Sequence, residues 1–347
     1  MVEKMKAMVL SKLGPIENNP LKLKSITKHR LQDTHELLVK IEACGVCRSQ
    51  LHGIEGDWKK YNIPPKLPTI PGHEIVGKVV EVGKDVRKFK IGQKIGISPL
   101  RNSCMNCMYC VAGKEHLCES ADITGESLMG GYAEYITVNE DFATLVPDKI
   151  NSEQAAPLFC AGITAYKAVK ATGPKPNTLL GIFGIGGVGH MAIQFATINK
   201  CKVVAVTRSQ IHINTAKKLN VHNAIQYRSQ SSFIKELKTT EGLLDDAIVF
   251  APSRKIVDTA IKSVKRGGSI TIGTFVNIPD FNVAEEKTIR GTLIGNRNDM
   301  KDVIKIAELG NITTIVEKYP MSKANEVLLK LKRSQIQARA VLIPNYS

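Results

Sequence analysis

Four of the eight cysteines stand close together, separated by two, two and seven residues. They are Cys104, Cys107, Cys110 and Cys118. Gaps of two residues place thiolates across a tight loop, and four sulfurs fill the tetrahedral shell of zinc, which leaves no position for catalysis. An iron–sulfur cluster uses a similar run, but its usual motif has a shorter last gap followed by proline, and Glu119 follows here. The spacing predicts a structural zinc site, with four free thiols as the plain alternative.

A glycine-rich segment joins an apolar run at 179–183 to a run of helical periodicity at 190–196. Its members are Gly184, Gly186, Gly187, Val188 and Gly189. The first glycines let the backbone turn tightly and approach a pyrophosphate, and the last lets the helix pack close to the strand. The helix N-terminus adds free N–H groups and positive potential. With a second strand at 202–207, the pattern predicts a dinucleotide-binding turn; the alternative is a glycine-rich packing turn.

The residues that end the second strand indicate which dinucleotide is bound. An acidic residue there would bind both ribose hydroxyls of NAD, yet the chain has Thr207, Arg208 and Ser209. One cation and two hydroxyls suit a 2′-phosphate better, so we expect NADP in preference to NAD. The alternative is that Arg208 is a solvated surface charge and that NAD binds without the carboxylate.

The other cysteines are scattered. Cys44 and Cys47 lie in one segment and Cys160 in another, while Cys201 follows much later. His73 stands in a Pro-Gly-His-Glu segment, which lies in the sequence after Cys47 and before Cys160. Each has a plain interpretation as a buried thiol or a core histidine, and spacing cannot join residues this far apart.

The secondary structure expected around these residues changes along the chain, from short β segments to alternating strands and helices. Up to about residue 147, short β segments at 37–42, 75–82, 95–97 and 132–138 are separated by Gly, Pro and Asp, which is typical of a β-rich region. Beyond Ser152, apolar strands at 179–183, 203–207, 246–250 and 269–273 alternate with amphipathic helices such as 211–219 and 256–264. This alternation predicts an α/β unit with a parallel sheet. A further helix is expected at 300–309.

Length and composition agree with two domains. The chain has 347 residues, with 43% hydrophobic and 23% charged residues, so disordered and collagen-like classes are excluded. The first ten residues are too polar for a secretory signal and no apolar run suits a membrane span, so we expect a cytoplasmic protein with reduced thiols. A net charge of +16 raises the alternative of a zinc-stapled nucleic-acid-binding protein. Its basic residues are dispersed and aromatics are only 5%, which disfavours that alternative.

Several short segments together resemble the zinc-dependent alcohol dehydrogenases of the medium-chain dehydrogenase/reductase family over essentially the whole chain. In the family's order, the matching segments are 45–52, 72–74, 104–118, 160–164, 184–189, 295–296 and Arg339. The resemblance implies a β-rich, GroES-like catalytic domain at 1–152 that contains the zinc loop 104–118. It also implies a Rossmann domain with a doubly wound parallel sheet at 153–296, and a segment 297–347 that returns to the catalytic domain.

The resemblance further implies a catalytic zinc held by Cys47, His73 and Cys160, with a fourth position for water or substrate oxygen. Glu74 would stand beside the metal or reach it transiently. With the cysteine tetrad, this makes two zinc ions per chain. One departure concerns the residue that orients the ligand histidine, because Gln50 stands where the family usually has Asp. An amide can accept the histidine N–H bond but supplies no charge, so zinc would be held less tightly or be more electrophilic.

By the same resemblance, Ser49 and His52 form a proton relay. The implied cofactor contacts, besides the glycine turn and the segment 207–209, are Arg48, Thr164, Gly295, Asn296 and Arg339. The implied reaction is hydride transfer between a primary or secondary alcohol and NAD(P), through a zinc-bound alkoxide, with an aldehyde or ketone as product. A zinc-free quinone or enone reductase of the same superfamily is the nearer alternative, but that branch lacks the metal cysteines. The resemblance implies a homodimer or homotetramer, with no nucleic acid or membrane partner.

Overall fold

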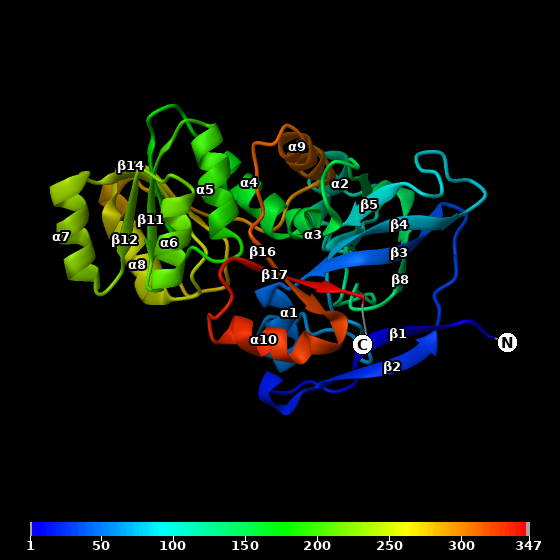
Figure 1. Ribbon diagram of the computed structural model, residues 1–347. Helices are drawn as coiled ribbons and strands as arrows, with labels where there is room; N and C mark the ends of the chain where they lie inside the picture. Colours follow the sequence, from blue (N-terminus) through cyan, green and yellow to red (C-terminus); the bar gives the residue numbers. More distant parts are fainter. Residues whose placement is uncertain (1, 345–347) are drawn as a thin grey trace. The chain divides into compact units, whose positions relative to one another are not determined.

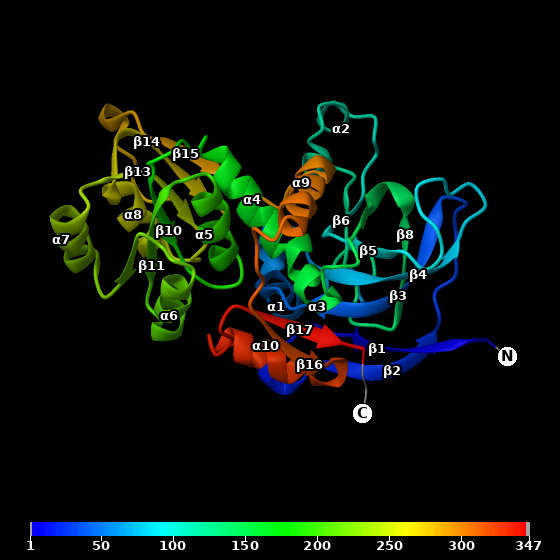
Figure 2. The same ribbon diagram turned by 45° about the horizontal axis from the view of Figure 1, so that its top comes forward.

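The computed structural model describes residues 2–344. The chain divides into two compact units, one formed by Met1–Cys160 with Asn296–Ser347 and the other by Ala161–Gly295. Figures 1 and 2 show the helices and strands of both units in two views. Within the described residues, no helix combines the length and the apolar character that a membrane span requires.

The unit Ala161–Gly295 is built on one six-stranded parallel sheet. Its strands are β10 (Leu179–Phe183), β11 (Lys202–Thr207), β12 (Asn223–Gln226), β13 (Leu244–Val249), β14 (Val264–Ile272) and β15 (Thr288–Gly291). The spatial order β12-β11-β10-β13-β14-β15 reverses direction beside β10. This is the doubly wound order in which ligands bind at the carboxyl ends of the strands beside the reversal.

Helices connect these strands. They are α4 (Ala161–Ala171), α5 (Gly189–Ile198), α6 (Gln210–Lys218), α7 (Gln230–Thr240) and α8 (Arg254–Ser263), with a short 3₁₀ helix η6 (Val283–Glu285). A capping box at Ser229 and Ser232 fixes the start of α7, because each side chain accepts a backbone N–H that the helix leaves unpaired. The predicted α/β region with a parallel sheet is confirmed.

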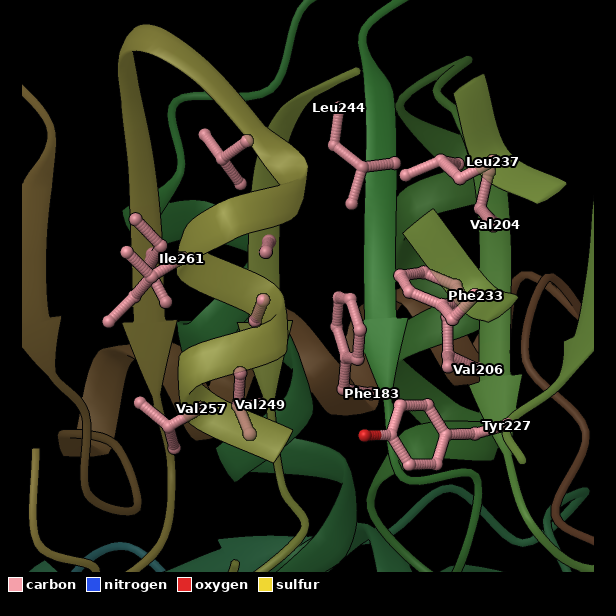
Figure 3. Packing of buried hydrophobic residues seen from close by; sticks show 14 of the residues in the cluster. Phe183, Val204, Val206, Tyr227, Phe233, Leu237, Leu244, Val249, Val257 and Ile261 are labelled. Carbon is pink, nitrogen blue, oxygen red and sulfur yellow. The ribbon is translucent and has the colours of Figure 1, made fainter. Parts of the chain in front are cut away.

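The core of this unit lies between the sheet and the helices α7 and α8 (Figure 3). All five residues of β10 are buried, as expected for a strand covered on both faces. Phe183 of β10 packs edge-on against Phe233 of α7, with ring centroids 5.6 Å apart. This packing fixes β10 and therefore the position of the glycine turn that follows it.

The other unit is β-rich. Its main sheet contains β16 (Val316–Pro320), β17 (Arg339–Ile343), β3 (Glu36–Gly45), β4 (Glu74–Val82), β5 (Lys94–Ile97), β9 (Ala143–Leu145) and β8 (Tyr135–Asn139). Two small sheets pair β1 (Lys4–Leu10) with β2 (Leu21–Thr27), and β6 (Leu100–Asn102) with β7 (Asp122–Ile123). The β-rich first region predicted from the sequence is confirmed.

Short helices fill the connections of this unit. The α-helices are α1 (Arg48–Glu55), α2 (Met108–Val111), α3 (Ser152–Ala155), α9 (Arg297–Glu308) and α10 (Ala324–Lys332). The 3₁₀ helices are η1 (Ile16–Asn18), η2 (Asp57–Tyr61), η3 (Glu115–Leu117), η4 (Glu140–Phe142), η5 (Ala156–Phe159) and η7 (Met321–Lys323).

Strand β3 organises the unit, because it pairs with β4, β8 and β17. Figure 1 shows β17, near the end of the chain, beside β3. Gly45 at the end of β3 faces both Val341 of β17 and Glu74 of β4. The segment after β3, the start of β4 and the start of β17 are therefore neighbours, although they lie far apart in the sequence.

Candidate metal centres and cofactor-binding turn

A buried cluster of four metal-binding side chains forms where β3 ends and β4 begins. Ligand atoms of Cys47, His73, Glu74 and Cys160 all lie within 4.8 Å of one another. The two sulfurs are 3.8 Å apart. Cys47 is the N-cap of α1, His73 immediately precedes β4, and Cys160 ends η5. The structure thus brings together the residues that the resemblance implied as catalytic zinc ligands.

Glycines allow this close approach. A Cβ at Gly45 would lie 1.8 Å from Oε2 of Glu74, so any side chain there would displace the carboxylate. Gly72, just before His73, has a φ of +100° and would place a Cβ 2.5 Å from the ring of Tyr132. Both the backbone conformation and the space therefore require glycine at this position.

Glu74 differs from the other three groups of the cluster because it forms an ion pair with Arg339. Nε of Arg339 donates to Oε2 of Glu74 at 3.0 Å, and Nη2 donates to Oε1. Both side chains are buried, at 0% exposure for Glu74 and 4% for Arg339. Because Arg339 compensates the charge of Glu74, this carboxylate competes less well for a metal ion than the two sulfurs and the imidazole, which form a donor set that zinc favours.

The two thiols of this cluster differ in proton affinity. The pKa of Cys47 lies well below its usual range because its sulfur accepts a hydrogen bond from Cys160. The same contact raises the pKa of Cys160, and burial raises it further. Cys47 is therefore the thiol of the pair that loses its proton more readily, and metal binding would require both sulfurs as thiolates.

The cysteine tetrad forms a second cluster, whose four sulfurs lie within 4.8 Å of one another. Helix α2 begins immediately after Cys107 and contains Cys110, and η3 ends just before Cys118. Backbone N–H groups of Asn106 and Cys107 lower the pKa of Cys104 to about 6, which favours the thiolate that binds metal. Four sulfurs without a carboxylate or an open side fit a structural zinc ion.

The start of α9 is connected to this loop. Nδ2 of Asn296 donates to the carbonyl of Gly113 at 2.6 Å, and Nε of Arg297 donates to Oε1 of Glu115 at 2.8 Å. Asn296 also caps α9 by accepting the N–H of Asp299. Asn296 was predicted to contact the cofactor, and that role stays a prediction beside the structural one.

The glycine turn connects β10 to α5 at the reversal of the sheet order. Gly184 has a φ of +99°, and a Cβ at Gly189 would lie 2.1 Å from the carbonyl oxygen of Gly184. Gly186, in contrast, has nothing within 4 Å of its Cβ position. Glycine is thus required by the fold at 184 and 189. At 186 the open space is consistent with the close approach of a phosphate group.

The segment at the end of β11 is available to a ligand. Thr207 is buried, Arg208 is exposed, and Ser209 is the N-cap of α6. Thr164 lies half-buried on α4, and Gly187 and Val188 precede α5 directly. These residues keep their predicted cofactor roles as predictions.

Comparisons with known proteins identify the family of this chain. Residues 33–148 match the family described as "Alcohol dehydrogenase GroES-like domain", and residues 187–308 match the family "Zinc-binding dehydrogenase". An alcohol dehydrogenase of Geobacillus stearothermophilus is 38% identical over 343 residues, which cover 97% of this chain and 99% of that protein. An alcohol dehydrogenase of Moraxella sp. is 35% identical over 88% of this chain and 91% of its own length.

Solved structures are equally similar in fold. The alcohol dehydrogenase of the archaeon Aeropyrum pernix has a TM-score of 0.90 and 28% identity, covering 98% of this chain and all of its own. The acetophenone reductase of Geotrichum candidum, solved with NAD, has a TM-score of 0.86 and 27% identity, covering 99% of this chain and 98% of its own. This chain belongs to the zinc-type alcohol dehydrogenases of the medium-chain family. Neither the nucleic-acid-binding nor the zinc-free alternative is favoured by these comparisons.

Gln50 holds His73, the predicted histidine ligand, in an unexpected way. The Gly72 N–H, which can only donate, lies 2.6 Å from Oε1 of Gln50, so the amide nitrogen faces Nδ1 of His73 at 2.9 Å. The amide therefore donates to Nδ1 and does not accept from it, contrary to the expectation from the sequence. A histidine that bound zinc through Nε2 would carry its proton on Nδ1, and this orientation of the amide would then place two donors face to face.

Sequence reasoning missed Glu126. Its Oε1 lies 3.4 Å from Nε2 of Gln50, and burial raises the pKa of its carboxyl group. No motif marked this residue, since it belongs to the loop between β7 and β8, far in sequence from Gln50. One signal in the sequence could have led to Glu126. Gln50 stands where the family usually has Asp, so a carboxylate from another segment could have been sought near Gln50.

The predicted relay residues lie on α1. Oγ of Ser49 is 3.4 Å from Nε2 of His73 and 3.5 Å from Sγ of Cys47. His52, one turn further along α1, bonds through Nδ1 to Oδ2 of Asp57 at 2.6 Å. Ser49 is thus beside the metal ligands. His52 is partly exposed, at 28% for its side chain, and can exchange a proton with water.

Two arginines predicted to hold the pyrophosphate make contacts inside the β-rich unit. Arg48 donates through Nη2 to the carbonyl of Leu331 at 2.8 Å, and Arg339 binds Glu74 as described. Their contacts with the cofactor stay predictions. Cys44 is fully buried and its pKa is raised by burial, in agreement with a packing thiol.

Proposed function

We propose that this dehydrogenase transfers hydride between a primary or secondary alcohol and NAD(P), with an aldehyde or ketone as product, at a zinc ion held by Cys47, His73 and Cys160. The observation that carries the proposal is the Glu74–Arg339 ion pair. Since Arg339 compensates the charge of Glu74, we assign only Cys47, His73 and Cys160 as ligands, which would leave the fourth position of zinc for substrate oxygen. A site with four protein ligands would be closed to chemistry.

Zinc, when bound, supplies a Lewis acid that makes an alcohol easier to deprotonate. The chain's own residues then handle the proton. Oγ of Ser49, beside the cluster, would accept the substrate proton as it releases its own hydroxyl proton, and the partly exposed His52 on the same face of α1 would deliver one proton to solvent. Nδ1 of His52 is hydrogen-bonded to Asp57, so Nε2 is the ring nitrogen that would exchange a proton with water.

We infer that NADP is the preferred cofactor. The exposed guanidinium of Arg208, with the hydroxyls of Thr207 and Ser209, suits a 2′-phosphate, and no carboxylate follows β11 to bind a ribose diol. Among similar structures, an enzyme of Helicobacter pylori was solved with NADP(H) and the Geotrichum candidum enzyme with NAD, so the fold accepts either. Exchange of Arg208 for Gln is expected to raise the KM for NADP and leave that for NAD unchanged.

The remaining parts of the proposal concern the whole protein. The tetrad would hold a second, structural zinc ion, the β-rich unit would be the catalytic domain, and Ala161–Gly295 would bind the cofactor. Eight free cysteines support a reducing, cytoplasmic location. A homodimer or homotetramer is proposed from family resemblance.

Zinc content and activity, measured on the same preparations, test the assignment. The intact chain should contain two zinc ions and oxidise alcohols. Cys47→Ser should lose one ion and all activity, while Cys104→Ser should lose one ion and thermal stability. Cys201→Ser, which changes a thiol outside both clusters, is the control. If Cys47→Ser retained full activity, the proposed centre would be wrong.

A further inference from the structure

A cavity of about 390 Å³ lies in the β-rich unit, among residues that neither metal cluster contains. Its polar wall combines Arg101 of β6 with Asp33 and Glu36 at the start of β3, together with Thr137 and Asn139 of β8. Leu128, Met129 and Ile136 form an apolar part of the wall. The volume falls in the range of small-molecule sites, about 300–1,000 Å³.

Arg101 is the unusual member of this wall. It is only 8% exposed, and in the described part of the chain its Nη1 is buried without a hydrogen-bond partner. Burial lowers the pKa of Arg101 to about 10, although the negative charges of Glu36 and Asp122 act to raise it. A buried guanidinium that the fold leaves partly unpaired costs stability, so an acceptor supplied from the cavity would stabilise it.

The acidic side of the cavity is held in place by its own backbone. Oε2 of Glu36 accepts the N–H groups of Gln32 at 2.6 Å and Asp33 at 3.3 Å. Oδ1 of Asp33 accepts the N–H of His35 at 2.8 Å. These bonds orient the two carboxylates toward fixed positions and use only one oxygen of each, so a donor on a ligand can be bound by the other.

We propose that this cavity binds a small zwitterion of amino-acid size, with its carboxylate on Arg101 and its ammonium group on Asp33 and Glu36. A simple anion would face two carboxylates, and a simple cation would leave the guanidinium unpaired, so neither satisfies both sides. The apolar wall of Leu128, Met129 and Ile136 suits an aliphatic side chain. The proposal concerns a site separate from the metal centre and does not depend on the reaction.

Calorimetric titration of the zinc-loaded full chain tests the proposal with three matched probes. L-leucine carries both charges, 4-methylpentanoate lacks the ammonium group, and 3-methylbutylamine lacks the carboxylate. We expect leucine to bind at least about tenfold more tightly than either analogue, because each contact with a charge is worth roughly one decade in affinity. The remaining standard amino acids, tested in the same way, define side-chain preference.

Variants separate this cavity from other binding places. Arg101→Met keeps the apolar stem of the side chain and should abolish leucine binding, and Asp33→Asn should weaken it about tenfold. Arg30→Met, which removes an exposed arginine from the same loop region, is the matched control and should bind normally. If Arg101→Met fails to fold, as judged by circular dichroism, the exposed position Asp33 still gives the answer. Equal binding of the three probes, binding unaffected by both variants, or no binding of any standard amino acid would overturn the proposal.

Discussion

Exchanging the charges of Gln50 and Glu126 is expected to tighten zinc binding at the catalytic centre. In Gln50→Glu with Glu126→Gln, the new carboxylate keeps its bond to the Gly72 N–H at 2.6 Å. Its other oxygen replaces the amide nitrogen 2.9 Å from Nδ1 of His73, so it accepts the proton that a zinc-bound ring carries there. The net charge of the pair is unchanged.

The expected gain in zinc affinity follows from the changed contact between residue 50 and Nδ1 of His73. A donor–donor contact becomes a hydrogen bond to a charged group, worth about 1.5–3 kcal/mol, which corresponds to about 10–100-fold in metal affinity. The single variant Gln50→Glu should gain less, because its carboxylate would stand about as close to Glu126 as the amide does now, at 3.4 Å. The single variant Glu126→Gln should change the affinity little.

Competition with a chromogenic chelator measures the affinity for the more weakly bound zinc ion in each variant. Running the assay on Cys104→Ser backgrounds removes the tetrad's contribution, so that one site is observed. Equal or weaker zinc binding by the charge-exchanged protein would refute the assigned orientation of the Gln50 amide and the argument built on it.

Three further outcomes are expected. Arg339→Met should free its carboxylate partner to occupy the open metal position, so kcat should fall by orders of magnitude while zinc content is retained, as measured by steady-state kinetics and metal analysis. Gly186→Ala should leave the melting temperature unchanged but weaken cofactor binding. Gly189→Ala should lower both the melting temperature and the cofactor affinity, because the Cβ at 189, unlike that at 186, would collide with the backbone. Thermal melts measure the first quantity and fluorescence titration the second. Glu140→Gln should destabilise the protein by about 1–3 kcal/mol at neutral pH, because backbone N–H groups lower the pKa of Glu140 against the effect of burial. That loss should vanish as pH falls below 4.5 through the folded-state pKa, when the native carboxylate also becomes protonated; urea unfolding at several pH values checks it.

Local patterns in the sequence predicted the parallel sheet and four of its six strands, but not the edge strands β12 and β15. The run 179–183 coincides with β10, and the helix expected at 211–219 is α6 (Gln210–Lys218). Uninterrupted apolar runs and amphipathic periods are properties of adjacent residues, so they can be read directly. The hairpin of β1 and β2 was missed, although Gly14-Pro15 and Asn19-Pro20 between the two strands are turn signals.

The candidate metal centre depended on different information. Spacing alone joined the four cysteines of the tetrad, but Cys47, His73 and Cys160 come from three separate elements that only strand pairing brings together. The resemblance to a family supplied that link. It could not supply the Gln50–Glu126 contact or the buried Arg101, because both depend on how side chains from distant segments pack in this particular chain.

Strand β17 gives the centre a particular order of assembly. By residue 160 a ribosome has made every group of the catalytic cluster, while Arg339 is still to be translated. Pairing of β17 with β3 then brings Arg339 to Glu74, so the cation that compensates this buried carboxylate comes from the last strand to be synthesised.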